Sequence, residues 1–140
     1  MALRLWKTFL ERIDVCYKII HIPTDEIDVF TAINGPSDAS VQTLALCFAI
    51  YYASVVVLDD CDVAALFQGN RILALHQFKL GLEQALAQAR FLEQPTVRLL
   101  QAIAIYLVSA LSLVSFRIAG SIQRTRLFFR CTTVAVVIGY

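Results

Sequence analysis

Three aspartates in the middle of the chain form its densest group of acidic side chains. They are Asp59, Asp60 and Asp62, in the stretch "VVVLDDCDVAALF". Grouped carboxylates are suited to holding Mg²⁺, and through it a diphosphate, in helical enzymes of the isoprenoid type. Such a site also requires a second carboxylate cluster opposite the first and basic residues that bind the phosphates. The first question is therefore whether this sequence supplies those additional groups.

The other acidic residues do not supply the second cluster. Glu83 and Glu93 are single acids without a paired partner. Asp60 directly precedes a short helical run, "CDVAALF", that Gly69 ends, and Asp62 falls in its first turn. Acids at these positions are ordinary stabilisers, and an N-cap contributes about 0.5–2 kcal/mol. We therefore interpret the aspartates as a solvated turn between buried helices and predict no catalytic, cofactor-binding or metal site; a Mg²⁺-dependent isoprenoid-type enzyme is our third hypothesis.

Histidines and cysteines do not form a recognisable site in the sequence either. We expect His21, just before a proline, to be a satisfied turn residue, and His76 to lie on a helix surface. Neither has a nearby serine or cysteine with an orienting acid, although distant residues can still assemble in space. The four cysteines, far apart and without a C-x-x-C pair, are expected to be buried reduced thiols: they are Cys16, Cys47, Cys61 and Cys131.

The composition is unusually apolar for a chain of this length. Of the 140 residues 59% are hydrophobic and only 16% are charged, against typical shares of about 45–50% and about 25%. The length suits one domain with a real core. The net charge of +1 gives no indication of nucleic-acid or membrane-surface binding. The excess apolar surface therefore requires a large core, a partner or lipid.

Two charge-free stretches leave a membrane protein open as the alternative hypothesis. They are Ala39–Leu58 and Leu99–Phe116, and both reach the length of about 17–25 residues that spans a bilayer. Arginines after the second stretch would form a plausible cytoplasmic flank. Each stretch could equally be the central helix of a large core. Charges from Lys7 to Asp14 interrupt any signal peptide, so none is expected.

The spacing of hydrophobic residues and the positions of capping residues, glycines and prolines predict an all-α fold, a compact bundle of about five helices. A stripe at steps of three and four, from Leu75 to Ala89, should face the core of a long helix in which Gly81 is a tolerated interior glycine. The first expected helices are residues 3–13, a helix capped by Thr24 and ending at Asn34-Gly35, and one from Ser37 or Asp38 to about Leu58. After the short helical run that follows Asp60, we expect residues 71–92, capped by Asn70, and a helix capped by Thr96 to about Leu113.

The chain resembles a known family in three successive stretches. "LWKTFLERIDVCYKIIHIPT", residues 5–24, keeps the order Leu-Trp, Phe-Leu, Ile-Asp, Lys-Ile and His-x-Pro-Thr, with Val15 where the family often has proline. "LALCFAIYYASVVVL" and "FKLGLEQALAQARFL…TVRLLQAIAIYL" follow in the same order. Together these stretches resemble the fungal-specific transcription factor domain, the regulatory middle region of zinc binuclear-cluster activators. The resemblance implies an all-α domain from a nuclear regulator of metabolic or secondary-metabolite genes.

The sequence departs from that family in two ways. The zinc cluster that binds DNA in the family is absent, since six closely spaced cysteines with basic residues between them occur nowhere in this sequence. The family region also continues past this length, so we expect a truncated domain at 5–107 followed by a divergent apolar and basic tail at 108–140. Within this tail "FRIAGSIQRTR" is similar to a later family segment, whereas "LFFRCTTVAVVIGY" is not and is conjectured to reflect a shifted reading frame or an intron.

The combined prediction is a transcription-regulator-like protein without catalysis that acts through helix-mediated protein interaction. Its partner would be a full-length regulator or a second copy, it would bind no specific DNA sequence itself, and it would reside in the nucleus. The alternative is the membrane protein with two spanning helices. Because later helices would cover Leu99–Leu113 in the resembled domain, we expect the isolated chain to be loosely packed or to aggregate unless a partner or lipid covers that face.

Overall fold

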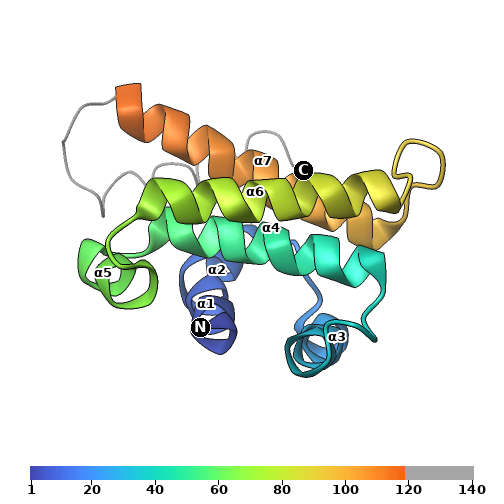
Figure 1. Ribbon diagram of the computed structural model, residues 1–140. Coiled ribbons are helices and arrows are strands. Elements are labelled where there is room, and N and C mark those ends of the chain that lie inside the picture. Colours follow the sequence, from blue (N-terminus) through green and yellow to red (C-terminus); the bar gives the residue numbers. More distant parts are fainter. Residues whose placement is uncertain (119–140) are drawn as a thin grey trace.

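The computed structural model describes residues 1–118, and the side chains of residues 1–115. Its first helical segment is continuous and consists of α1 (Ala2–Phe9), the π-helical η1 (Leu10–Asp14) and α2 (Val15–Tyr17). Five separate helices follow, which confirms the predicted all-α multi-helix bundle (Figure 1). They are α3 (Ile22–Asn34), α4 (Val41–Val57), α5 (Asp60–Phe67), α6 (Arg71–Gln88) and α7 (Val97–Ile118).

Helix α4 lies at the centre of the bundle. It runs between α6 and α7 on one side and the shorter α1, α3 and α5 on the other (Figure 1). Residues such as Ala45, Leu46, Ala49 and Ile50 have no exposed surface at all. A helix enclosed on all sides must be apolar around its whole circumference. The first charge-free stretch is thus the central helix of the core in this structure.

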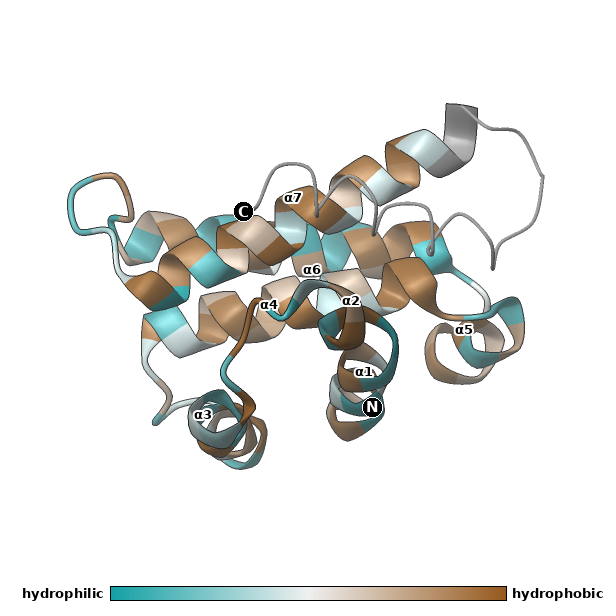
Figure 2. Ribbon diagram, turned by 180° about the vertical axis from the view of Figure 1, so that it is seen from behind, coloured by the Kyte–Doolittle hydropathy of each residue, from teal (hydrophilic) through white to brown (hydrophobic). Residues whose placement is uncertain are grey.

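Helix α7 contains the second charge-free stretch, and it is buried on one side only. Leu99, Ala102 and Ile105 are buried, whereas Leu107 and Leu111 are more than half exposed. Among residues 1–118, one helix is long and apolar enough to cross a membrane, over Val97–Ser115, whereas α4 is apolar but shorter. In Figure 2 the ribbon of α7 is coloured largely as hydrophobic.

Two predicted helix starts were wrong. Helix α3 begins at Ile22, with His21 as N-cap instead of Thr24. Pro23 therefore lies in the first turn, where its missing N–H is not needed for a helical hydrogen bond. Helix α4 begins after Ser40, whose hydroxyl accepts a hydrogen bond from the Thr43 N–H at 3.1 Å. The predicted start at Ser37 or Asp38 falls instead in the preceding turn.

The later helices agree better with the predicted caps. Asn70 caps α6 by accepting a hydrogen bond from the Leu73 N–H at 2.9 Å, and Thr96 accepts one from the Leu99 N–H at 3.4 Å. Both caps are confirmed. Helix α6 ends at Gln88, before the predicted end at residue 92, and Arg90 adopts a left-handed conformation in the turn that follows. Helix α7 continues past the predicted end to Ile118, without a break between residues 107 and 108, where the predicted domain meets the predicted tail. Residues 119–140 of that tail lie outside the described part of the chain.

Gly81 has a packing role that its sequence context did not indicate. A Cβ atom at this position would lie 2.8 Å from Cε1 and 2.9 Å from Cδ1 of the Phe48 ring. The α6 backbone therefore approaches α4 closely at Gly81, where the Phe48 ring projects toward it. Gly81 is required for this approach and is more than a tolerated interruption of the helix.

We expect Gly81→Ala to destabilise the fold. Alanine favours the helix by about 1 kcal/mol over glycine, but forcing a methyl group into a packed interface costs about 1–3 kcal/mol. The net loss in the free energy of unfolding should be at most about 2 kcal/mol, measured by urea unfolding followed with far-UV circular dichroism. The double variant Gly81→Ala/Phe48→Leu replaces the Phe48 ring by a smaller side chain and should recover part of the lost stability. A gain in stability from the single substitution would show that α4 and α6 do not pack as described.

Candidate functional site

The acidic turn between α4 and α5 is bound to three arginines from separate parts of the chain. Each aspartate pairs with a different guanidinium. The pairs are Arg4–Asp62, Arg12–Asp59 at 3.0 Å and Arg71–Asp60 at 3.0 Å. The N-cap of α5 is Asp59, one residue before the predicted Asp60, and Asp60 and Asp62 occupy the first turn.

Two of these arginines also bind the C-terminal end of α4. Arg12 donates a hydrogen bond to the Val57 carbonyl at 2.8 Å, and Arg71 donates to the carbonyls of Val55 at 2.7 Å and Leu58 at 2.6 Å. The last carbonyls of a helix lack partners within the helix, and positive charge is favourable there. The hydrogen bond to Asp59 raises the pKa of Arg12 above its ordinary value.

This geometry gives the aspartates a structural use. Their carboxylates neutralise the arginines that cap α4, instead of converging on one point where a cation could bind. No group of three or more histidine, cysteine or acidic side chains suited to a metal occurs among the described residues. No sequence pattern indicated these pairs, because the partners are separated by 11 to 58 positions.

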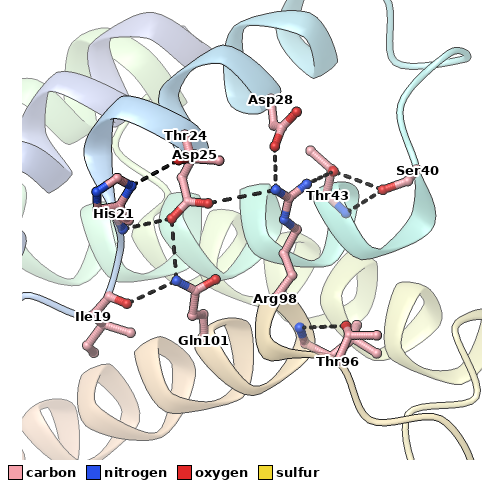
Figure 3. Close-up of polar contacts among 11 residues, drawn as sticks. Ile19, His21, Thr24, Asp25, Asp28, Ser40, Thr43, Thr96, Arg98 and Gln101 are labelled. Atoms are coloured by element: carbon pink, nitrogen blue, oxygen red, sulfur yellow. Dashed lines mark hydrogen bonds and ion pairs between the residues drawn. The ribbon is translucent and has the colours of Figure 1, made fainter.

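A second polar cluster joins α3, α4 and α7 at the opposite end of α4 (Figure 3). Arg98 pairs with Asp28, donates to the Thr43 hydroxyl at 3.0 Å and lies 3.9 Å from Asp25. Gln101 donates to the Ile19 carbonyl at 3.1 Å and to Asp25 at 3.4 Å.

Asp25 is the buried centre of this cluster. It is only 4% exposed, and its Oδ2 also accepts the His21 backbone N–H at 2.8 Å. A buried carboxylate is tolerated only when its charge and its lone pairs are satisfied. Asp25 meets that condition by linking the start of α3 to α7, so the cluster holds these elements together.

The two histidines and the three described cysteines lie on five different helices or their caps. The His21 ring shares a hydrogen bond with the Thr24 hydroxyl at 2.9 Å, and His76 is exposed on α6 as predicted. Cys16, Cys47 and Cys61 are free thiols, of which only Cys47 is buried and Cys61 is exposed, so the prediction of burial was wrong for Cys61. Cys131 lies outside the described residues.

Burial makes Cys47 a poor nucleophile. Desolvation raises its pKa to about 12, and it also raises the pKa of the adjacent Tyr51. Since the thiolate is the reactive form of cysteine, Cys47 remains protonated and inert at neutral pH.

Two hollows in the described part of the structure have no charged side chain in their lining. A gap of about 10 Å³ beneath α7 has room for about one water molecule. A more open hollow of about 340 Å³ lies where α5 meets α6. Its lining consists of apolar and amide side chains: Leu66, Phe67, Gln68, Asn70, Leu73, Ala74 and Gln77.

Replacing Asp59, Asp60 and Asp62 together with asparagine tests the structural role of the turn. Partly exposed ion pairs contribute about 0–1 kcal/mol each, so the triple variant should lose about 1–2 kcal/mol of unfolding free energy. Millimolar Mg²⁺ should leave the melting temperatures of both the wild type and the triple variant unchanged. A Mg²⁺-dependent stabilisation of the wild type that the variant lacks would restore the metal hypothesis.

Arg98→Ala should be more costly because it leaves Asp25 buried without its cation. Removing one partner of a buried pair costs about 3–5 kcal/mol, and the partial exposure of Arg98 reduces this to about 2–3 kcal/mol. Arg90→Ala is the matched control, since its pair with Glu93 is exposed on the surface and should contribute less than about 1 kcal/mol. Chemical unfolding curves of the two variants measure the difference; equal losses would contradict the role given to Asp25.

Known proteins that are similar to the chain share one kind of function. The chain is 33% identical over 108 residues to the aurofusarin cluster transcription factor aurR2 of Gibberella zeae. It is 33% identical over 107 residues to the pyriculol/pyriculariol biosynthesis cluster transcription factor 1 of Pyricularia oryzae, and 32% identical over 113 residues to the C6 finger domain transcription factor nscR of Aspergillus fumigatus. These matches cover 77%, 76% and 78% of this chain.

The similarity covers only a small part of each relative. The chain spans 16%, 14% and 14% of the lengths of these three proteins. No family model matches the chain, and no solved structure matches it. The relatives are named as transcription factors and not as enzymes. The chain is therefore related to the fungal C6 zinc-cluster transcription factors, among them regulators of secondary-metabolite gene clusters.

Proposed function

We propose that this chain is a helical regulatory segment of the fungal transcription-factor type, corresponding to the middle region of those proteins and binding no specific DNA sequence itself. It acts in the nucleus by packing its helices against a protein partner, which is a zinc-cluster regulator or a second copy. The observation that carries the proposal is the similarity to named transcription factors over about three quarters of the chain. That span is long enough to include most of the helices that build the core.

The charge arrangement supports a function without direct DNA binding. Sequence-independent affinity for DNA comes from lysines and arginines that are available to phosphates. All eight such residues with described side chains lie within 4 Å of an acid: Arg4, Lys7, Arg12, Lys18, Arg71, Lys79, Arg90 and Arg98. The side chains of the remaining arginines, at position 117 and beyond, lie outside the part of the chain that the structure describes. The four cysteines in the whole sequence are too few for a six-cysteine zinc cluster.

A reporter experiment tests the regulatory role. The full chain is fused to an unrelated DNA-binding domain and expressed in a fungal cell whose reporter gene carries the matching binding site. We expect the fusion to change reporter output by several-fold relative to the DNA-binding domain alone, and Arg98→Ala to weaken the change because it loosens the contact between α3 and α7. Output equal to that of the DNA-binding domain alone, from a fusion that is expressed and nuclear, would contradict the proposal.

The absence of intrinsic DNA recognition is tested with the purified chain. Fluorescence anisotropy should show the same weak, salt-sensitive binding to a fungal promoter fragment and to a scrambled duplex. Sequence-specific binding that persists at high salt would show that this chain reads DNA by itself.

A further inference from the structure

Helix α7 carries a row of large apolar side chains on the side that faces away from the bundle. They recur at helical spacing along the helix, and we call them the α7 face: Val97, Leu100, Leu107, Leu111 and Val114. Each of these side chains is between 52% and 75% exposed. A continuous apolar surface of this kind marks a site of interaction with a partner or a membrane.

The opposite side of α7 determines how a membrane can reach the helix. Leu99, Ala102 and Ile105 are buried, and α7 packs on α4 along this side (Figure 1). The length and composition of Val97–Ser115 would allow the helix to cross a bilayer, but crossing would require α7 to leave the bundle. A folded bundle offers a membrane the α7 face alone, with the helix lying flat on the lipid surface.

The sequence from residue 94 onward is basic, which the net charge of the whole chain conceals. Residues 1–93 contain seven basic and eleven acidic residues, a net charge of −4, whereas residues 94–140 contain five arginines and no acid, a net charge of +5. Arg98 is used within the bundle, where it pairs with Asp28. The other four arginines follow the α7 face within residues 117–130, which we call the basic segment: Arg117, Arg124, Arg126 and Arg130.

The α7 face and the basic segment together match the chemistry of an anionic lipid surface. Peripheral proteins bind such surfaces by placing an apolar helix face at the boundary between headgroups and acyl chains, while nearby lysines and arginines attract the anionic headgroups. Helices of this kind usually carry their basic residues on their own polar side. In α7 the bundle covers that side, and the positive charge follows in the adjoining sequence.

A partner helix would fit the α7 face less well. In coiled coils, charged residues that flank the apolar seam along its length select the partner and its orientation. Over residues 97–115 the one ionic side chain of α7 is Arg98, which faces Asp25 and Asp28 within the bundle. The other charges follow the face in sequence, so they do not flank it. A lipid surface requires no such register, because it presents the same headgroups everywhere.

We propose that the chain binds anionic lipid surfaces through the α7 face and the basic segment, with α7 lying flat and the bundle intact. This surface goes beyond the proposed function and does not depend on it. One apolar anchor alone gives only weak, reversible binding, and stable attachment requires a second signal such as a basic patch. Each arginine near an anionic surface strengthens binding about fivefold, so the basic segment should supply that second signal.

Flotation of the full chain with vesicles tests the proposal. One set of vesicles is pure phosphatidylcholine, and the other contains about one-third phosphatidylserine. Aggregated protein sediments, so the floating fraction reports lipid binding. We expect the wild type to bind the anionic vesicles at least about tenfold more tightly than the neutral ones, and this preference to disappear in about 0.5 M salt.

Two variants separate the contributions of the apolar face and the charge. Leu107→Glu/Leu111→Glu should weaken binding to both kinds of vesicle at least about tenfold. Ile72→Glu/Leu80→Glu on α6 is the matched control, because it adds the same charge at exposed apolar positions of another helix, and it should bind better than the α7 variant by a similar factor. Circular dichroism checks that both variants remain folded.

The charge variant replaces the last three arginines of the basic segment. Arg124→Gln/Arg126→Gln/Arg130→Gln should keep the weak binding to phosphatidylcholine and lose the preference for phosphatidylserine. A preference that this variant retains would contradict the role of the basic segment.

Several outcomes would overturn the inference. A wild type that floats with neither kind of vesicle has no lipid site; if it also forms a dimer that the α7 variant loses, the α7 face belongs to a second copy. Anionic binding that the α7 variant retains in full would mean attraction of the arginines to any polyanion. Resistance to carbonate extraction would mean that α7 leaves the bundle and spans the bilayer. An active reporter without flotation refutes the lipid surface alone, and flotation with an inactive reporter refutes the proposed function alone.

Discussion

The fold depends on enclosing one helix that has no polar face. Ten of the seventeen residues of α4 are buried, and because its circumference is apolar, no side can be left to water at low cost. Helices α1 and α3 cover one side, and α6 and α7 cover the other (Figure 1). The need to cover α4 thus explains why a chain of this size devotes so many elements to a single central contact.

Polar interactions then fix how the covering helices are placed. Near the C-terminal end of α4, arginines of η1 and α6 donate hydrogen bonds to its carbonyls and form ion pairs with the aspartates at the start of α5. Near the N-terminal end, Arg98 and Asp25 connect α3 to α7. Hydrophobic contact is not directional, so it alone would allow the helices to slide or rotate. Gly81 adds a steric restriction, since α6 can approach closely only where the Phe48 ring meets a position without a side chain.

The sequence predicted those features that depend on neighbouring residues. The caps at Asn70 and Thr96 are local hydrogen bonds within three residues, and the apolar periods revealed the all-α architecture. Most of the missed features depend on distant partners. Nothing near Asp59 indicates Arg12, 47 positions earlier, and nothing near Gly81 indicates a ring on another helix. The start of α3 was misplaced because Thr24 looks like a cap, yet Pro23 fits within the first turn of the helix. The resemblance to transcription factors provided the functional hypothesis, which helix patterns alone could not supply.

The two polar clusters at the ends of α4 have a consequence for how the helix opens. Carboxylate–guanidinium contacts at partly exposed sites weaken as salt screens them, whereas the apolar middle of α4, around Ala49 and Ile50, is not weakened in this way. Raising the ionic strength should therefore speed amide hydrogen exchange at the two ends of α4 and leave its centre among the slowest-exchanging amides. The helix would fray from both ends toward a centre that opens only when the whole bundle unfolds.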